Sequence, residues 1–214
     1  MFCSLYLCER AVMKKNKIIE LIKSKSGVYL IMLGTGLGLT VGMTLNLLYI
    51  LDASMLTDYA NQFSDTTEYS SFLWKVFFIC LAGPVIEEML YRGVLYRVVK
   101  RFLPYLWANL IQAVIFAISH YNPIQTFYTF NLGLILGYTY SKYQTIAAPI
   151  LIHISFNVMG FLLPELLTVY VLSRVQNIGI LFSIVFSLLC IGIFLFCRAF
   201  LKIKQFRVRL IEYV

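Results

Sequence analysis

Long apolar runs separated by short polar or basic segments make up most of this chain. The run from Val28 to Leu51 is uncharged and exceeds the ~20 residues that a transmembrane α-helix needs. The other apolar runs end at prolines or charged clusters, which are typical of helix boundaries. The pattern predicts an all-α fold, a multi-pass transmembrane helix bundle of about six spanning helices, at 28–51, 72–101, 104–120, 124–140, 149–163 and 178–196.

Glycine recurs at every fourth position of the first predicted helix, at Gly34, Gly38 and Gly42. This spacing leaves three bare patches on one helix face, so we predict that another helix packs closely against it. A dinucleotide-binding loop is excluded, because no strand precedes these glycines and the GxGxxG spacing is absent.

Composition narrows the class of protein. Of the 214 residues, 60% are hydrophobic and 13% are charged, and the mean hydropathy is +0.81. Soluble domains carry about 25% charged residues, so this is an integral membrane protein. The net charge of +8 does not indicate nucleic-acid binding, because no basic stripe is interleaved with exposed aromatic residues. Five cysteines without a CxxC spacing imply neither a disulfide framework nor a zinc ribbon.

Charges between the apolar runs indicate the topology. Basic residues cluster at both termini and at Arg97, Lys100 and Arg101, whereas residues 52–68 carry four acidic residues and no basic one. Cytoplasmic segments of membrane proteins are rich in Lys and Arg. We therefore expect both termini in the cytoplasm and residues 52–68 outside, in what is expected to be a bacterial plasma membrane.

Three regions follow from this topology: a cytoplasmic amino-terminal segment at 1–27, a transmembrane helical domain at 28–201, and a basic cytoplasmic tail at 202–214. The apolar run within residues 1–10 is too short to span a membrane and lacks the cleavage site of a signal peptide. Because Met13-Lys14-Lys15 looks like a bacterial initiation region, Met13 is expected to be the true start.

Two adjacent carboxylates, Glu87 and Glu88, interrupt the second apolar run together with Arg92. An ionisable side chain at the bilayer centre costs roughly 2.5–3.5 kcal/mol on insertion scales, so it marks a functional site by default. Glu88 and Arg92 lie one helical turn apart and can form an ion pair. Such a pair could also be purely structural. Glu87 has no such partner in sequence. The preceding Gly83-Pro84 predicts that the helix begins or kinks there.

The two histidines of the chain, His120 and His153, also lie in apolar helices, and Asn157 follows His153 by one turn on the same face. A lone membrane histidine can simply hydrogen-bond a neighbouring helix. Here the polar groups come from three helices, and unpaired polar groups are costly inside a membrane. We predict that Glu87, His120, His153 and Asn157 converge around one cavity. Such a cluster supplies a base, imidazoles and an amide donor, which peptide-bond hydrolysis needs.

Three motifs carry a family resemblance. Residues Glu87–Arg92, Phe116–His120 and His153–Asn157 read, in this order, as EExxxR, FxxxH and HxxxN. In this order they resemble the motifs of the CAAX protease and bacteriocin-processing family, intramembrane endopeptidases that are often labelled metalloproteases and are related to the Ras-converting CAAX protease. The resemblance covers a motif core at 72–163.

The resemblance implies a role for each matching residue. Glu87 would be the catalytic base, with Glu88 beside it in the catalytic set. His120 would help to orient the attacking water, and His153 with Asn157 would stabilise the oxyanion. The implied supporting residues are Arg92 and Phe116.

Two mechanisms remain open from the sequence. In a metal-dependent version, Glu87 or Glu88 with His120 and His153 would bind zinc and leave one position for water. In a metal-free version, Glu87 polarises the water directly, and the resemblance to the structurally described CAAX enzyme favours this one. The three groups are not held on one helix as in HExxH, so the spacing alone does not decide.

The depth of these residues poses a geometric problem. Simple alternation of helices puts Glu87 near mid-membrane, His120 toward the outer end and His153 toward the cytoplasmic end. At 1.5 Å per residue they would lie on the order of 15 Å apart along the membrane normal. Convergence therefore requires a broken helix or a re-entrant segment, expected at Gly83-Pro84 or Asn122-Pro123.

The expected substrate is a peptide or precursor in or at the membrane. A helical segment has its carbonyls already hydrogen-bonded, so the site should take an extended peptide bond beside an apolar anchor, as in a lipid-modified or amphipathic peptide. The basic segments would attract it, or anionic membrane lipid, to the cytoplasmic face. The chain is short for the eukaryotic branch, which disfavours prenylated CAAX substrates. Small bacterial members are associated with peptide maturation and bacteriocin immunity.

Two other classes are compatible with the same polar cluster. A catalytically silent immunity or scaffold protein would bind a bacteriocin-like peptide or a partner helix. A transporter also uses broken helices and midplane charges, but the absence of an inverted repeat counts against it.

Overall fold

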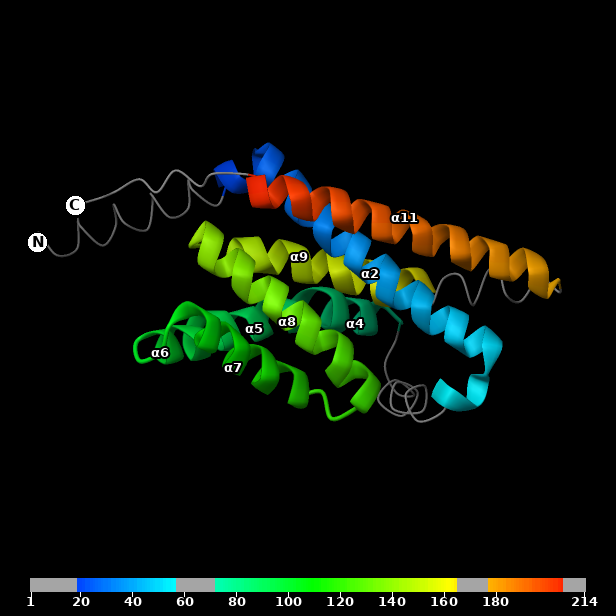
Figure 1. Cartoon of the computed structure of the whole chain (residues 1–214), viewed down its shortest axis with the longest axis horizontal. Helices are drawn as coiled ribbons and strands as arrows, with labels where there is room; N and C mark the ends of the chain where they lie inside the picture. The colour runs from blue at the N-terminus through cyan, green and yellow to red at the C-terminus, as the bar shows by residue number, and fades with distance from the viewer. Residues whose placement is uncertain (1–18, 57–71, 165–176, 206–214) are drawn as a thin grey trace, which may run out of the picture.

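The computed structural model describes residues 19–56, 72–164 and 177–205, and within these ranges the regular structure is entirely helical. All six predicted helical segments are present (Figure 1). The elements are α2 (Lys25–Leu51), η1 (Ala53–Leu56), α4 (Phe72–Val76), η2 (Phe77–Ala82), α5 (Gly83–Glu88), η3 (Met89–Leu95), α6 (Tyr96–Lys100), α7 (Tyr105–Ile118), α8 (Pro123–Tyr143), α9 (Ala147–Asn157), η4 (Val158–Leu162) and α11 (Ile178–Gln205). The predictions on the start codon and on most of the tail concern residues outside the described ranges.

The helix ends differ from the predicted ones for local reasons. Ser24 caps α2 by accepting a hydrogen bond from the backbone N–H of Gly27, so this helix begins at Lys25. Asn122 caps α8 in the same way, on the backbone N–H groups of Ile124 and Gln125. The last helix continues to Gln205, nine residues past the predicted end, because no proline or glycine interrupts it there.

Residues 72–100 form one continuous helical run in which the winding alternates between α and π. The π turns η2 and η3 flank α5, which carries Glu87 and Glu88. As predicted for Gly83-Pro84, α5 begins at Gly83 with Pro84 in its first turn. The chain does not break there, however. Proline lacks the N–H that an α-helix would use, and the π turn before it changes the hydrogen-bond pattern at this point.

Helix α2 packs between α9 on one side and α11 on the other (Figure 1). A β-carbon at Gly34 would overlap the carbonyl oxygen of Ile152, and one at Gly38 would overlap that of Phe156. The predicted close helix contact on this glycine face is therefore confirmed. On the opposite side of α2, Gly36 and Gly192 allow the same backbone approach to α11.

Helix α9 lies at the centre, where it contacts α2, α5, η2 and α8, while α7 packs on α8. Large apolar side chains remain exposed on the outer faces, among them Trp74, Phe77, Trp107 and Phe194. Among the described helices, α2 and α11 are long and apolar enough to cross a membrane, and the segments 105–118 and 147–162 are shorter apolar helices. This arrangement fits an all-α membrane protein.

Candidate active site

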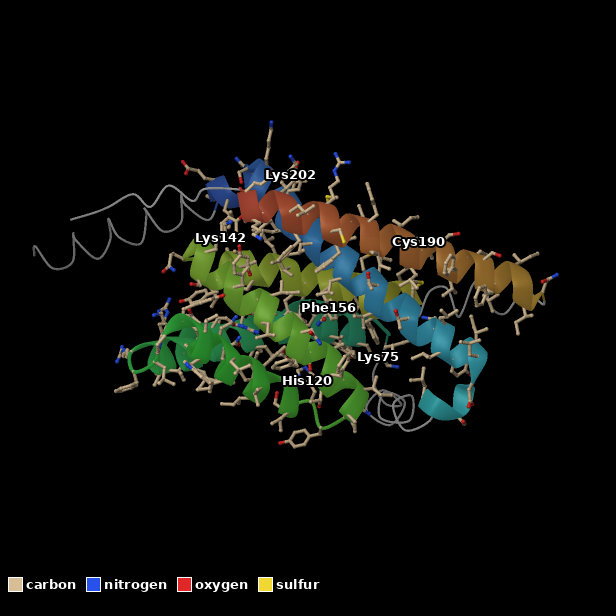
Figure 2. The ribbon with its side chains drawn as sticks, in the orientation of Figure 1. Lys75, His120, Lys142, Phe156, Cys190 and Lys202 are labelled. Carbon is tan, nitrogen blue, oxygen red and sulfur yellow. The ribbon has the colours of Figure 1, made fainter. Side chains whose placement is uncertain are left out.

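A cavity of about 300 Å³ lies between α2, the run 72–100, α8 and α9. Its wall includes Glu87, His120, His153 and Asn157, the four residues predicted to converge. The prediction of a common cavity is confirmed. Because the four residues share one cavity, the expected separation in depth does not arise. His120 follows the end of α7 at Ile118 and lies at the edge of the helices in the view of Figure 2.

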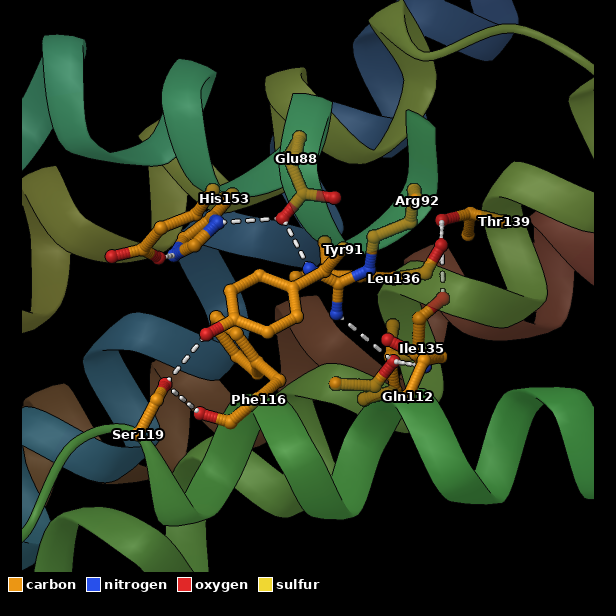
Figure 3. Close-up of polar contacts among 12 residues, drawn as sticks. Glu88, Tyr91, Arg92, Gln112, Phe116, Ser119, Ile135, Leu136, Thr139 and His153 are labelled. Carbon is orange, nitrogen blue, oxygen red and sulfur yellow. Dashed lines mark hydrogen bonds and ion pairs between the residues drawn. The ribbon is translucent and has the colours of Figure 1, made fainter. Parts of the chain in front are cut away.

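Glu88, Arg92 and His153 form a buried charged cluster next to this cavity (Figure 3). Arg92 Nη1 donates to Glu88 Oε1 at 2.7 Å, as their spacing predicted. His153 Nδ1 lies 2.8 Å from the same oxygen. A carboxylate oxygen only accepts, so the His153 proton sits on Nδ1 and its Nε2 carries a lone pair when the ring is neutral. Glu88 therefore fixes both the orientation and the tautomer of His153.

The Arg92 guanidinium has further partners deep in the bundle. Its Nη2 donates to the backbone carbonyl of Gly133 on α8 at 3.3 Å. Its central carbon lies 4.7 Å from the centroid of the Phe116 ring, within cation–π range. Arg92 and Glu88 are both fully buried. Since a buried charge must be paired, Arg92 supplies the counter-charge for Glu88.

Glu87 differs from Glu88 in being partly exposed to the cavity, with 36% of its side chain accessible. Its Oε2 lies 3.6 Å from His153 Nε2, which is too long for a direct hydrogen bond. The two adjacent carboxylates thus have different environments. Glu88 is bonded inside the protein, whereas Glu87 faces the space where a substrate or water would lie.

Phe116 holds the two histidines in place from the other side. Its ring meets His120 and His153 nearly edge-on, at centroid distances of 4.9 and 5.7 Å. His120 Nδ1 lies 2.8 Å from the backbone carbonyl of Phe116, so this nitrogen carries the proton. Tyr91 packs on the same ring and donates from its hydroxyl to Ser119.

Asn157 has a contact that its sequence position did not suggest. Its Nδ2 donates at 2.7 Å to the backbone carbonyl of Ile79 in the π turn η2. A π turn changes the hydrogen-bond partners of backbone carbonyls. The Asn157 amide supplies a donor for the Ile79 carbonyl from a different helix. One N–H of Asn157 therefore ties α9 to the helix that carries Glu87.

Sequence reasoning missed two buried amides on α7, Gln112 and Asn109. Gln112 Nε2 donates at 2.9 Å to the Gly133 carbonyl that also accepts from Arg92. Asn109 Nδ2 donates to the carbonyl of Leu134. The sequence did contain a signal for them: an amide side chain in an apolar helix is costly to bury, so each of the two needs a specific hydrogen-bond partner.

The zinc alternative finds no ligand set in the described part of the chain, where no three His, Cys, Asp or Glu side chains are grouped to hold a metal ion. The Nδ1 atoms of both histidines already face oxygen acceptors, Glu88 for His153 and the Phe116 carbonyl for His120. A histidine that binds a metal ion through Nε2 makes the same kind of contact through Nδ1.

Comparisons with known proteins agree with the motifs. Residues 69–159 match the family described as "Type II CAAX prenyl endopeptidase Rce1-like". The chain is also 30% identical over 88 residues to the membrane-embedded CAAX protease MroQ of Staphylococcus aureus (strain USA300), which covers 36% of this chain and 34% of that protein. The chain thus spans about a third of the length of the curated relative it matches. No solved structure matches.

Proposed function

We propose that the chain is an intramembrane endopeptidase, from the match of residues 69–159 to the Rce1-like family of CAAX endopeptidases and from the site geometry. It would hydrolyse a peptide bond in a membrane-associated, lipid-modified or amphipathic peptide or precursor. The observation that carries the proposal is the pairing of Glu87 with His153, 3.6 Å apart at the cavity wall, with His153 held by a buried Glu88–Arg92 pair.

In the proposed mechanism, a water molecule lies between Glu87 Oε2 and His153 Nε2. Two acceptors 3.6 Å apart can each accept one hydrogen bond from the same water. Glu87 takes a proton from the water as its oxygen attacks the substrate carbonyl, and later gives that proton to the leaving amine. Glu88 does not take part directly, because its hydrogen-bonded oxygen is engaged by Arg92 and His153.

The developing oxyanion needs donors in the same cavity. Asn157 lines it, and we assign its amide to the substrate carbonyl. His120 also lines the cavity, but because its Nδ1 proton faces the Phe116 carbonyl, it can donate to the oxyanion only as an imidazolium. The second N–H of the Asn157 amide is the one not used on Ile79. In this scheme Asn157 both shapes the helix that carries Glu87 and contacts the substrate.

We propose chemistry that does not depend on a metal ion, in which Glu87, partly exposed at the cavity wall, acts on the water directly. The membrane arrangement is proposed to be multi-pass, with both termini in the cytoplasm of a bacterial plasma membrane and lipid around the apolar outer faces. A substrate then reaches the site as an extended segment next to a membrane anchor. An extended segment has unpaired backbone groups, which the bilayer core does not accommodate, so it must enter the cavity from the part of the peptide beside the anchor.

Cleavage by the full chain in liposomes tests the proposal. The substrate is a set of fluorogenic peptides carrying an apolar anchor. We expect Glu87→Gln to lower the cleavage rate by roughly 10²–10⁴-fold, because the base is lost. The matched control is Lys100→Gln, at an exposed position of α6, which should leave the rate unchanged.

Three outcomes would contradict parts of the proposal. Full activity of Glu87→Gln would remove Glu87 from its role as base. Loss of cleavage with a chelator, restored by zinc, would overturn the metal-independent chemistry. Tight peptide binding without any cleavage would favour the silent immunity or scaffold alternative.

A further inference from the structure

Basic side chains gather at one end of the bundle. In the described ranges this end holds the start of α2, the ends of α6 and α8 and the end of α11 (Figures 1 and 2). The basic residues there are Lys23, Lys25, Arg97, Lys100, Arg101, Lys142, Arg198, Lys202 and Lys204, and the acidic residue there is Glu20. At the opposite end, the described charged residues are Asp52 and Lys75.

The cavity occupies the half of the bundle away from this basic end. Its wall on α2 is formed by Val41 and Leu45, about 24 and 30 Å along the helix from Lys25 at 1.5 Å per residue. On α8 the wall includes Gln125, in the first turn of the helix and about 27 Å from its basic end. Glu87 lies near the middle of the run 72–100, at the inner limit of the cavity.

Close packing separates the cavity from the basic end. Arg92, Gln112, Leu136 and Thr139 are each 0% exposed, and they lie on the basic side of the histidines. Beyond them Tyr96 and Tyr140 are buried against each other, with ring centroids 5.3 Å apart. A peptide coming from the basic end would have to displace this layer, including the buried ion pair that holds His153.

Lys and Arg mark the cytoplasmic side of membrane proteins. We infer that the catalytic cavity opens toward the extracytoplasmic half of the membrane, and that the substrate is an extracytoplasmic peptide segment next to its membrane anchor. The part of the inference that concerns a substrate rests on the proposed function. The direction in which the cavity opens is inferred from charge and packing alone. The inferred substrate differs from the cytoplasmic one expected from the basic segments of the sequence.

Cysteine labelling in intact cells tests the facing without any activity assay. In a full-length variant with all five native cysteines replaced by serine, one cysteine is introduced at a time. Tyr121→Cys reports the end nearest the cavity, where Tyr121 is 90% exposed beside His120. Lys100→Cys is the matched control at the exposed basic end.

A membrane-impermeant maleimide should label Tyr121→Cys at least tenfold more than Lys100→Cys in intact cells. Both should be labelled equally after permeabilisation, which shows that both introduced cysteines are reachable. The reverse preference in intact cells would overturn the inference, and so would equal labelling of the two before permeabilisation.

A substrate presented on one side of the membrane at a time links the direction in which the cavity opens to the reaction. One cleavable peptide is fused to a single membrane helix so that it projects either outside or into the cytoplasm. Cleavage of the outside version at least tenfold faster is expected, whereas preferred cleavage of the cytoplasmic version would overturn the inference about the substrate. If neither version is cut while Tyr121→Cys still labels from outside, the proposed proteolysis fails and the facing of the cavity stands.

Discussion

Removal of the Arg92 guanidinium should destabilise the fold more than almost any other single substitution. Arg92→Met deletes a 2.7 Å charge-assisted hydrogen bond to Glu88 and a 3.3 Å bond to the Gly133 carbonyl. It leaves a fully buried carboxylate whose remaining partner is His153. Breaking a buried pair by removing one partner costs about 3–5 kcal/mol in the free energy of unfolding.

The double variant isolates the reason for this loss. Glu88→Gln alone leaves Arg92 buried without its hydrogen-bonded counter-charge, so it should cost a similar amount. In Glu88→Gln/Arg92→Met no charge is left unpaired, and the glutamine oxygen still accepts from His153. The double variant should therefore be no less stable than either single variant. This corresponds to a coupling free energy between the two substitutions of roughly 3 kcal/mol, at the upper end for residues in contact.

Reversible unfolding in mixed micelles, followed by tryptophan fluorescence, measures these differences. The control is Arg101→Met at the exposed end of the same helical run, which should change stability by less than about 0.5 kcal/mol. Cleavage should fall in all three cluster variants, because each of them disrupts the buried Glu88–Arg92 pair that holds His153. Additive losses in the double variant, or a nearly neutral Arg92→Met, would refute the argument from the buried pair.

Two further substitutions test the packing and the π turn. Gly34→Ala should lower the free energy of unfolding by about 1–3 kcal/mol, because its β-carbon overlaps a carbonyl of α9. The control is Gly93→Ala, where the atom nearest to the new β-carbon is a side-chain methyl at 3.4 Å. It should be neutral or stabilising in the same assay. Asn157→Leu should cost about 1–3 kcal/mol, because the Ile79 carbonyl loses its donor, and should also reduce cleavage; unchanged stability would show that this carbonyl finds another partner.

Much of the fold could be predicted because its determinants are local. The apolar runs gave the helices, the prolines gave most of the boundaries, and the Gly34 face predicted a close helix contact that the packing against Ile152 confirms. The pairing of Glu88 with Arg92 followed from helical spacing alone. Each of these inferences needed only neighbours within about one or two helical turns.

The parts of the site that escaped prediction are non-local or involve the backbone. His153 meets Glu88 across 65 positions of sequence, and nothing in either motif says which of the two glutamates it would contact. The π turns are patterns of backbone hydrogen bonds that side-chain periodicity does not encode. The Gly133 carbonyl became a partner of Arg92 only through the packing of α8, and no motif contains it.

The glycine contacts on both sides of α2 bear on how the molecule can move. Close backbone approach leaves little room for α9 or α11 to shift against α2, so we expect these three helices to move together. The cavity has one wall on these helices and the other on the run 72–100 and α8. We therefore expect any widening of the cavity that admits a peptide to come from the second wall, with Glu87 moving relative to His153.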